Sequence, residues 1–598
     1  MKCSNPFVFG LWLSVATLSA TAHEGRHGSV HDTVAAVMAR LQRTLSEDEL
    51  VKLTSAKAET LLTPAERQVL ATEHIRFSVS VPVIVTIARE AGSDEVFWLR
   101  DGGFVRKEGT VKVHTRELAL WEKTFPAGEI GLGVHNLSGQ GTHYLALLRP
   151  RKQGDNLKVT GLYPAHLRTV PFVAGVQPYS DQQVRLESVP AQLQGQLLIQ
   201  TAAARAQDAK LVNLFSRTEF PASNRPDQVV LTWSGDPRTT QTVQWRSAFR
   251  AGRGALRYHL KGATGEGAAT PRVAQARTER IITPMLVNDP LVLRHTVTLT
   301  GLNPGSVYVY SVGDGTANGW TEPAEFTTAP AGVEPFSFIY MGDAQNGLDR
   351  WGLLLARAHA ARPDAAFYLM AGDLVNRGAE RWDWDSFFEH SKGVFNRRTL
   401  APVIGNHECQ GGVPRLYLDL FTLPRNGPAA LESERAYSFE YSNAKFIILD
   451  SNLPPESQTS WLEKQLAGTT ATWKFVSYHH PAYSSSPNRD NKKLRNVWTP
   501  IFDKYHVDLA LQGHDHAYLR TYPMRGKQRV ATARDGTIYV ISVSGTKYYD
   551  QGPHDYTEAG FTKVSTYQVL DIQIQGNRLV YRAHDLDGKI RDEFVIQK

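Results

Sequence analysis

The spacing of apolar residues changes along the chain and divides it into segments. Between residues 23 and 74, apolar residues recur at three- and four-residue intervals, as at Val34, Val37, Met38 and Leu41, which predicts helices. From residue 75 to about 197, short alternating runs are separated by turn sequences such as Asp101-Gly102-Gly103, which predicts an all-β segment. A helix-compatible bridge over 202–215 would close this part, so we expect an all-β domain with a helical bridge over 75–215.

A second all-β unit is predicted over residues 216–332. Residues 229–233 and 242–245 have the pattern of paired sandwich strands, and residues 302–310 resemble the tyrosine-corner segment of fibronectin type III-like sandwiches. The run Thr327-Thr328-Ala329-Pro330-Ala331-Gly332 has the composition of a linker.

Residues 333–598 alternate short apolar runs of buried-strand length with helical stretches. The strand runs are 336–340, 366–370, 402–404, 446–449, 475–478 and 509–511, and the clearest helical stretches are 351–361 and 492–505. This alternation predicts a layered α/β domain.

The first 22 residues have the pattern of a secretory signal. Lys2 precedes an apolar stretch over 7–20, and Ala20-Thr21-Ala22 offers a small-x-small cleavage site, so we expect a periplasmic or secreted protein. An uncleaved N-terminal anchor is the alternative; otherwise no long apolar run predicts a membrane span. After signal removal Cys409 would be the one cysteine, which excludes an intrachain disulfide. His23, His27 and His31 fit a solvated N-terminus better than a metal site.

Charge and composition place only loose limits on function. The chain has 598 residues, 42% of them hydrophobic, and a formal net charge of +7, which suits a multidomain globular protein with anionic substrates. The basic residues are scattered, so the sequence carries no nucleic-acid-binding signature.

The chemistry of the chain lies in polar motifs that follow the apolar runs of 333–598. They are Gly342-Asp343-Ala344-Gln345, Gly372-Asp373-Leu374-Val375-Asn376-Arg377-Gly378, Gly405-Asn406-His407-Glu408, His479-His480, Gly513-His514-Asp515-His516 and the weaker Arg489-Asp490-Asn491. Carboxylate, amide and imidazole groups are the ligands that a pair of divalent or trivalent ions needs. Because each motif follows a strand, we expect them on loops at one edge of the sheets.

These motifs resemble those of the metallophosphoesterase superfamily, and the preceding sandwich narrows the resemblance to purple acid phosphatase-like proteins. The resemblance covers about residues 221–598 and implies a four-layer α/β/β/α core, so the expected fold is multidomain α+β. It also implies two metal ions. Asp343, Asp373 and His516 would hold the first ion; Asp373, Asn406, His479 and His514 would hold the second, with Asp373 as the bridge.

Further residues are candidates for catalysis and substrate binding. His407 and His480 stand beside ligands and are candidates for protonating the leaving group and clamping the phosphoryl oxygens, and Arg377 for a bidentate phosphate contact. For Arg489, Asp490 and Asn491 a solvated loop competes with substrate contact, and Asp490 is also a candidate helix cap.

Two positions depart from the pattern of the resemblance. Purple members place a tyrosine three residues after the bridging aspartate, where this chain has Asn376, and other members have Asp-x-His where this chain has Gln345. The first metal must then accept three side chains and water, or an amide oxygen from Gln345 or Asn376. Loss of the phenolate argues against an Fe³⁺–tyrosinate centre and favours Mn²⁺, Zn²⁺ or Fe²⁺. We also expect Asn376 to hold His407 by a neutral hydrogen bond.

The sequence therefore predicts an exported two-metal phosphoester hydrolase. Our first hypothesis is a broad-specificity phosphomonoesterase, acid phosphatase-like, in which a metal-bridging hydroxide attacks phosphorus in line. A phosphodiesterase or nucleotide pyrophosphatase uses the same chemistry and is the alternative enzyme. An envelope binding protein with a vestigial metal domain is the alternative from another class. The expected partners are phosphorylated small molecules.

Overall fold

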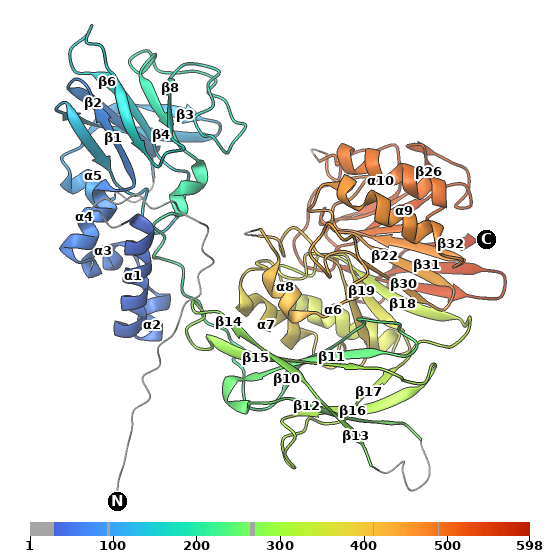
Figure 1. Ribbon diagram of the computed structural model, residues 1–598. Helices are drawn as coiled ribbons and strands as arrows, with labels where there is room; N and C mark the ends of the chain where they lie inside the picture. The colour runs from blue at the N-terminus through green and yellow to red at the C-terminus, as the bar shows by residue number, and fades with distance from the viewer. Residues whose placement is uncertain (1–28, 93–95, 263–269, 411, 488) are drawn as a thin grey trace, which may run out of the picture. The chain divides into compact units, whose positions relative to one another are not determined.

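The computed structural model describes residues 29–92, 96–262, 270–410, 412–487 and 489–598 (Figure 1). The predicted signal over 1–22 and two of the three N-terminal histidines, His23 and His27, lie outside these ranges. The chain divides into two compact units, Met1–Phe215 and Ser216–Lys598. None of the helices in the described ranges is both long and apolar enough to cross a bilayer.

Four helices open the first unit. They are α1 (Val30–Thr44), α2 (Glu47–Val51), α3 (Ser55–Leu61) and α4 (Pro64–Thr72). Side-chain oxygens start each of them; in the capping box of α2, the Ser46 hydroxyl accepts from the Glu49 N–H while the Glu49 carboxylate accepts from the Ser46 N–H. The periodic residues Val34, Val37 and Leu41 form the buried face of α1. Residues 30–72 are thus helical, as their periodicity predicts.

The rest of the first unit is built from antiparallel strands. They are β1 (Ile75–Val79), β2 (Val83–Glu90), β3 (Val105–Val113), β4 (Arg116–Phe125), β5 (Gly128–Leu132), β6 (Leu145–Pro150), β7 (Val159–Tyr163), β8 (Arg168–Pro171) and β9 (Leu197–Gln200), with the short helix α5 (Phe97–Asp101) after β2. They form a three-stranded sheet, β5-β1-β7, and a six-stranded sheet, β3-β4-β2-β6-β9-β8.

The prediction of a helix-compatible bridge over 202–215 is wrong. The structure has only a 3₁₀ turn there, η1 (Ala203–Gln207). The Asp181 carboxylate accepts from the N–H groups of Ala203 and Ala204 and starts the turn. Beyond it, Leu211 and Val212 donate their N–H groups to the Leu137 carbonyl, so neither makes a helical hydrogen bond.

A chain of buried histidines lies inside the first unit. Arg205 Nη2 donates to His74 Nδ1 at 3.2 Å, His74 Nε2 lies 2.8 Å from His143 Nε2, and His143 Nδ1 lies 2.8 Å from the Tyr144 carbonyl. A carbonyl only accepts and a guanidinium only donates, so the protons are fixed: His143 carries its proton on Nδ1 and His74 on Nε2. Both imidazoles must therefore be neutral for this chain of hydrogen bonds to exist.

The second unit begins with a β-sandwich. Its strands are β10 (Asp227–Thr232), β11 (Gln241–Ala248), β12 (Ala255–Leu260), β13 (Arg272–Gln275), β14 (Arg277–Ile282), β15 (Leu291–Leu299), β16 (Val307–Gly313) and β17 (Ala324–Thr327). They form two four-stranded sheets, β10-β11-β15-β14 and β13-β12-β16-β17, around Trp245. The Tyr308 hydroxyl accepts from the Asn303 N–H at 2.9 Å, which is the hydrogen bond of a tyrosine corner.

Two larger sheets follow the sandwich. The first, β20-β19-β18-β30-β31-β32, contains β18 (Phe336–Met341), β19 (Phe367–Met370), β20 (Thr399–Pro402), β30 (Thr566–Gln573), β31 (Arg578–Asp585) and β32 (Ile590–Gln597). The second, β21-β22-β23-β24-β28-β25-β29, contains β21 (Tyr437–Tyr441), β22 (Ala444–Ile448), β23 (Trp473–Ser477), β24 (Leu509–Gln512), β25 (Tyr518–Thr521), β28 (Ile538–Ile541) and β29 (Thr557–Phe561). A small hairpin joins β26 (Met524–Arg525) to β27 (Gln528–Arg529).

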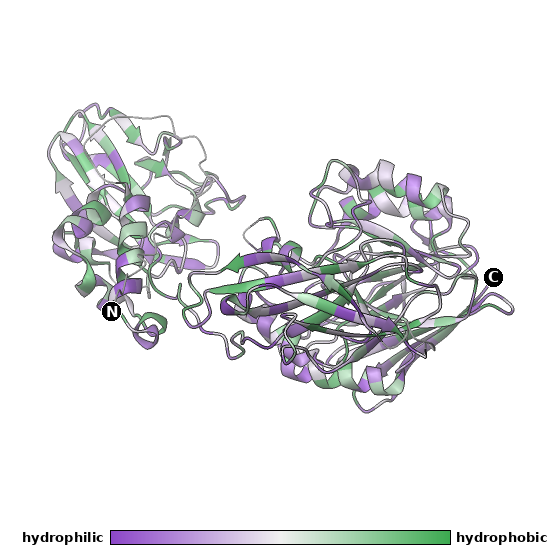
Figure 2. Cartoon of the chain, turned by 60° about the horizontal axis from the view of Figure 1, so that its bottom comes forward, coloured by the Kyte–Doolittle hydropathy of each residue, from purple (hydrophilic) through white to green (hydrophobic). Residues whose placement is uncertain are grey.

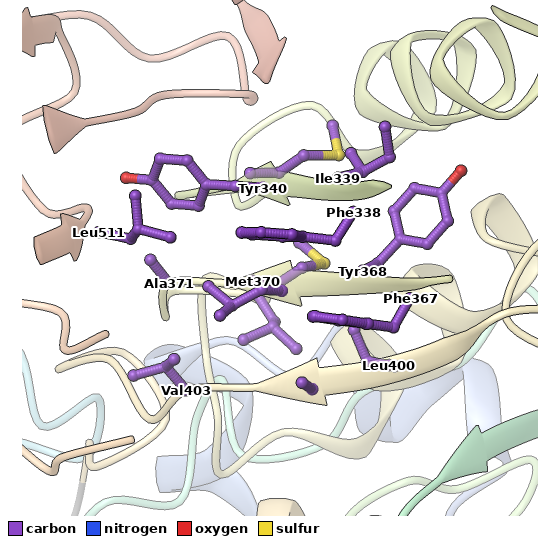
Figure 3. Packing of buried hydrophobic residues seen from close by; sticks show 14 of the residues in the cluster. Phe338, Ile339, Tyr340, Phe367, Tyr368, Met370, Ala371, Leu400, Val403 and Leu511 are labelled. Carbon is purple, nitrogen blue, oxygen red and sulfur yellow. The ribbon is translucent and has the colours of Figure 1, made fainter. Parts of the chain in front are cut away.

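Aromatic residues join the two sheets face to face. Phe338 stacks on Phe367 in the first sheet at 5.1 Å between ring centroids and meets Phe446 and Phe475 of the second edge-on at 5.2 and 5.4 Å. Figure 3 shows Phe338 and Phe367 among the buried side chains of this interior. Residues 402–404 were expected as a strand, but β20 ends at Pro402, and Val403 and Ile404 lead into the next loop.

Helices cover the two outer faces, which completes four layers. The helices of this region are α6 (Leu348–Ala361), α7 (Arg381–His390), α8 (Arg415–Leu420), α9 (Thr459–Ala467) and α10 (Lys492–Tyr505). Trp351 of α6 and Phe387 of α7 pack into the core of the first sheet, whereas Leu462 of α9 and Trp498 of α10 pack on the second. Helices in Figure 2 carry hydrophobic and hydrophilic residues side by side, as expected for helices that cover a sheet with one face. The multidomain α+β fold, with β-sandwich sheets before mixed α/β sheets, is confirmed.

Candidate metal centre

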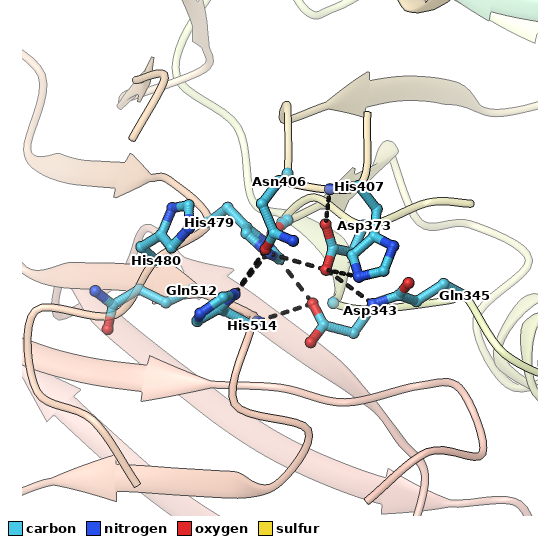
Figure 4. A network of polar contacts seen from close by, with 12 residues as sticks. Asp343, Gln345, Asp373, Asn406, His407, His479, His480, Gln512 and His514 are labelled. Carbon is cyan, nitrogen blue, oxygen red and sulfur yellow. Dashed lines mark hydrogen bonds and ion pairs between the residues drawn. The ribbon is translucent and has the colours of Figure 1, made fainter. Parts of the chain in front are cut away.

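The six predicted metal ligands lie on loops that follow five strands. Asp343 follows β18, Asp373 follows β19, Asn406 follows β20, His479 follows β23, and His514 and His516 follow β24. Strands β18, β19 and β20 are parallel to one another, as are β23 and β24. Their carboxyl ends therefore lie at one edge of each sheet, and Figure 4 shows five of the six side chains, all but His516, converging there.

Four of these residues, Asp373, Asn406, His479 and His514, have ligand atoms close enough together to bind one ion. Asn406 Oδ1 lies 3.1 Å from His479 Nε2 and 2.8 Å from His514 Nδ1. His479 Nε2 also lies 3.1 Å from Asp373 Oδ2. Atoms bound to one ion at 2.0–2.2 Å are separated by about 3–3.5 Å, so this donor set fits a single ion.

A second group shares Asp373 with the first. Asp343, Asp373 and His516 each offer a ligand atom within 4.8 Å of the others. Asp343 Oδ2 is buried without a hydrogen-bond partner, which is costly unless a cation or water binds it. Two candidate groups with one carboxylate in common have the arrangement of a bridged pair of ions.

Backbone carbonyls orient two of the histidines. His479 Nδ1 donates to the Ala371 carbonyl at 2.9 Å, and His516 Nδ1 donates to the Lys547 carbonyl at 3.0 Å. In the neutral form of each imidazole the lone pair is then on Nε2, the nitrogen that faces the carboxylates and could bind a cation.

The backbone of the ligand loops adopts a conformation that residues other than glycine rarely take. Asp343, Asp373, His514 and His516 have φ angles of +49°, +51°, +76° and +46°. Left-handed backbone at non-glycine residues costs free energy and is concentrated at functional sites. Four of the six candidate ligands share this feature.

Glycines let these loops approach one another. A Cβ on Gly405 would lie 2.1 Å from Asp373 Oδ1, and one on Gly513 would lie 2.4 Å from Asp343 Oδ1. Any side chain at either position would displace a candidate ligand, which is the physical reason that the motifs pair glycine with a ligand.

The electrostatics of the site favour a positively charged occupant. Burial, reinforced by the Asp373 carboxylate, raises the pKa of Asp343 well above its usual range. Burial lowers the pKa of His479, but the Asp373 and Asp343 carboxylates outweigh it and raise this pKa to about 10. Both shifts show that the two buried carboxylates attract positive charge, which a proton supplies when no cation is bound.

Comparisons with known proteins agree with this geometry. Residues 226–328 match the family described as "Purple acid Phosphatase, N-terminal domain", and residues 336–518 match "Calcineurin-like phosphoesterase". The chain is a purple acid phosphatase-like protein. The two matched segments correspond to the β-sandwich and to the sheets that carry the ligand loops.

Relatives of this purple acid phosphatase-like chain are distant. An uncharacterised protein of Mycobacterium tuberculosis is 27% identical over 338 residues, covering 50% of this chain and 62% of that protein. Fe(3+)-Zn(2+) purple acid phosphatase 12 of Arabidopsis thaliana is 26% identical over 330 residues, covering 50% and 66%. The chain thus spans less than two thirds of the length of these relatives. The purple acid phosphatase PPD1 of yellow lupin shares the fold, with a TM-score of 0.54 at 15% identity over 88% of this chain and 91% of that one.

His407 and His480, the predicted acid–base candidates, lie beside the ligand cluster. His407 Nε2 lies 3.9 Å from Asp373 Oδ2, and the His480 ring lies 4.3 Å from that of His514. The expected side-chain contact between Asn376 and His407 is wrong, because His407 Nδ1 donates to the main-chain carbonyl of Asn376 at 2.5 Å. The identity of the side chain at position 376 therefore does not determine this bond.

Arg377 lies at the surface. Its guanidinium packs over the Trp382 ring at 5.7 Å, and its main-chain N–H donates to the Asp383 carboxylate. Across the described residues, it makes no hydrogen bond or ion pair with a candidate ligand. A phosphate contact by Arg377 stays a prediction.

The three residues of the weak motif Arg489-Asp490-Asn491 make different contacts. Arg489 lies at the centre's edge, where Nη1 donates to the His514 carbonyl at 3.2 Å. Asp490 does not cap α10, contrary to expectation, because it pairs with Arg495 at 2.8 Å. Asn491 is the N-cap residue, but its side chain donates to the Pro481 carbonyl instead of capping the helix.

Sequence reasoning missed two buried carboxylates that hold the ligand loops. Glu408 accepts from the N–H groups of Asp373 and Gly405 through Oε2, at 2.9 and 2.7 Å, and from Leu374 and Val375 through Oε1, at 2.9 and 3.3 Å. Asp515 accepts from the Ser484 hydroxyl and the Ser485 N–H, both at 2.6 Å. Each acid stands next to a candidate ligand in its motif, which was the available signal.

A wall beside His516 was also missed. The Tyr549 ring lies 4.8 Å from the His516 ring, with Arg489 and Lys547 over it at 4.8 and 5.2 Å. The Tyr549 N–H donates to the His516 carbonyl at 3.0 Å, so this wall is fixed to the ligand loop.

Glu408→Gln is expected to destabilise the second unit by about 3 kcal/mol or more and to lower its metal content. The new NH₂ group would face two backbone N–H donors and leave them buried without an acceptor. Thermal unfolding and metal analysis of the purified chain measure both effects, with the exposed Glu432→Gln as the matched control. A Glu408→Gln protein with unchanged melting temperature and full metal content would contradict this role.

Proposed function

We propose that this chain is an exported hydrolase that uses two metal ions to cleave phosphomonoesters. The observation that carries the proposal is that the two candidate metal-binding groups of residues share Asp373. Two ions bound there would supply Lewis acidity and lower the pKa of a water molecule. The residues of the chain would bind the ester, orient it and move protons.

His480 is suited to hold a phosphoryl oxygen. The Ser451 hydroxyl oxygen accepts from the His480 N–H at 2.9 Å and lies 2.9 Å from His480 Nδ1. Burial lowers the pKa of His480 to about 3, so its imidazole is neutral, and in the tautomer in which Ser451 donates to Nδ1 the imidazole proton is on Nε2. Neutral His480 is then a hydrogen-bond donor without carrying charge.

His407 is suited to protonate the leaving group. Its Nδ1 proton is committed to the Asn376 carbonyl, so Nε2 is the nitrogen free to give and take a proton. That nitrogen lies on the Asp373 side of the cluster, opposite the His480 side in Figure 4. We therefore assign binding of the phosphoryl oxygen to His480 and protonation of the leaving group to His407.

The rim of the site favours an anionic substrate. Arg489 and Lys547 place two positive charges at the Tyr549 wall, next to candidate ligand His516. Basic side chains at the mouth of a site raise the local concentration of anions and speed their association.

The proposed ions are divalent Mn²⁺, Zn²⁺ or Fe²⁺, and the iron-loaded protein is expected to be colourless. Asn376 stands where the resemblance places the tyrosine, and an amide cannot form the phenolate–Fe³⁺ bond that absorbs visible light. Absorption spectra of protein reconstituted with iron in air test this. A charge-transfer band in the visible would contradict it.

The exported location is part of the proposal and rests on the signal-like sequence of residues 1–22. Cell fractionation tests it: the chain is expected outside the cytoplasm, shortened at about Ala22.

Turnover of an aryl phosphate and of the matching bis-aryl diester tests the substrate class. We expect a higher kcat/KM for the monoester, with activity lost to a chelator and restored by a divalent ion. A preference for the diester would replace the monoesterase by a phosphodiesterase. No turnover of either by protein that holds two ions would overturn the hydrolase proposal.

A further inference from the structure

In the side-chain amide of Gln345, the nitrogen has hydrogen-bond partners but the oxygen has none. The residue is fully buried, and its Nε2 lies 2.8 Å from Asp373 Oδ2 and 3.1 Å from His516 Nε2. Its Oε1 is buried without a hydrogen-bond partner. A buried amide oxygen without a donor is rare in folded proteins and calls for a missing partner.

The two neighbours of this amide are both candidate ligands of the first ion. His516 donates through Nδ1 to the Lys547 carbonyl, so its Nε2 presents a lone pair toward Gln345. Asp373 presents carboxylate oxygen from the other side. Rotating the amide by half a turn would place Oε1 between these two lone pairs, where three acceptors repel one another unless a cation lies among them.

Resting on the two-metal function proposed above, we propose that Gln345 Oε1 is the fourth protein ligand of the first metal ion. The amide donates through Nε2 when the site holds no cation and turns Oε1 to the ion when it does. The first ion then has Asp343, Asp373, His516 and Gln345, and the second has Asp373, Asn406, His479 and His514. Each ion receives one neutral amide.

The charge of this ligand set selects the oxidation state. Asp343 and Asp373 are the only anionic side chains among the seven ligands, so the protein contributes two negative charges and no phenolate. Two divalent ions match this set better than a trivalent and a divalent ion together, because each further positive charge would remain uncompensated in a buried site.

Asn376 has the other side-chain amide that the sequence offers as a ligand, but this residue makes a different contact. Its carbonyl accepts from His407 Nδ1, and its side chain is only half-buried. The Gln345 amide, by contrast, lies within hydrogen-bond distance of both Asp373 and His516. Gln345 is therefore better placed than Asn376 to bind the first ion.

Metal titration of apo protein in competition with a chromogenic chelator tests the ligand without relying on activity. Zn²⁺ gives affinities, and Co²⁺ gives a visible spectrum that reports coordination number. Gln345→Ala is expected to keep one ion at wild-type affinity and to bind the other more weakly, by about 10–100-fold or more. Gln345→Glu, which keeps an oxygen ligand but has no N–H group, is expected to restore that affinity. Asn376→Ala is the matched comparison and should leave both affinities unchanged.

Three results would overturn the proposal. They are unchanged binding of both ions by Gln345→Ala, failure of Gln345→Glu to bind better than Gln345→Ala, and loss of the weaker ion in Asn376→Ala. The second would mean that the amide acts only as a donor to Asp373. Wild-type protein that binds two ions but hydrolyses no phosphoester would refute the proposed function while leaving this ligand test intact.

Discussion

Asp373→Asn is expected to lower hydrolysis of an aryl phosphate by at least about a thousandfold, equivalent to about 4 kcal/mol of transition-state stabilisation. Asp373 is the one residue common to both candidate metal groups. An asparagine offers one neutral oxygen in place of a charged carboxylate, so it cannot neutralise two ions that repel each other. We expect the variant to hold less than one equivalent of tightly bound metal.

Asp373 also contributes to the shape of the site, so the test needs a check on folding. Its Oδ1 accepts from the His407 N–H at 3.0 Å, a bond that an asparagine oxygen can keep. Circular dichroism should therefore change little. Asp349→Asn, at an exposed position in α6, is the matched control and should keep two ions and full activity. An Asp373→Asn protein with two bound ions and more than a tenth of wild-type activity would contradict the bridging role.

The first unit is expected to lose stability in mild acid. Burial lowers the pKa of His74 and of His143 well below the usual value, with Arg205 reinforcing both, and burial with Arg89 lowers that of His135 to about 4. The Asp208 carboxylate lies 3.8 Å from His74 Nδ1, but Arg205 also pairs with it at 3.0 Å. In the unfolded chain the three histidines titrate near 6.5.

The sign of the effect follows from these pKa values. Above about pH 6.5 the histidines are neutral in both states, and their stability contribution is fully present. As the pH falls below 6.5 the unfolded chain takes up protons that the folded unit cannot, so the free energy of unfolding decreases until the folded pKa values are reached. Each histidine lowers it by about 1.4 kcal/mol per pH unit, so three lower it by about 6 kcal/mol at pH 5. That approaches the whole stability of a typical domain.

Hydrogen exchange of the full chain, corrected for the intrinsic pH dependence, measures this loss of stability in the first unit. Peptides from residues 74–150 should lose protection between pH 7 and pH 5. His143→Gln should flatten the pH dependence by about one proton, since one titrating group is removed. His166→Gln, at an exposed position, is the control and should leave it unchanged. Equal protection of the first unit at both pH values would contradict the prediction.

The ligand loops were predictable because glycine, ligand and strand lie next to one another in the sequence. The position of Asp373 immediately after a buried run was enough to place it at a sheet edge with Asp343 and Asn406. The left-handed backbone of Asp343, Asp373, His514 and His516 was not visible in the sequence, because it arises from contacts between loops that are distant along the chain.

Other features depended on partners that no local pattern reveals. The 202–215 segment has helical propensity, but Asp181 and Leu137 take its backbone N–H groups and leave only a 3₁₀ turn. Asp490 is a good capping residue by type, yet Arg495 binds it. The four N–H groups on Glu408 come from two separate loops, so its role as their common acceptor appears only in three dimensions.

The proposed hydrolysis requires two ions held by one bridging carboxylate. Stepwise addition of Mn²⁺ or Zn²⁺ to metal-free protein, with bound metal and aryl phosphate turnover measured on the same samples, tests it most directly. We expect little turnover at one equivalent and a rise to the maximum as the second equivalent binds. Maximal turnover with no ion or with one ion per chain would contradict it.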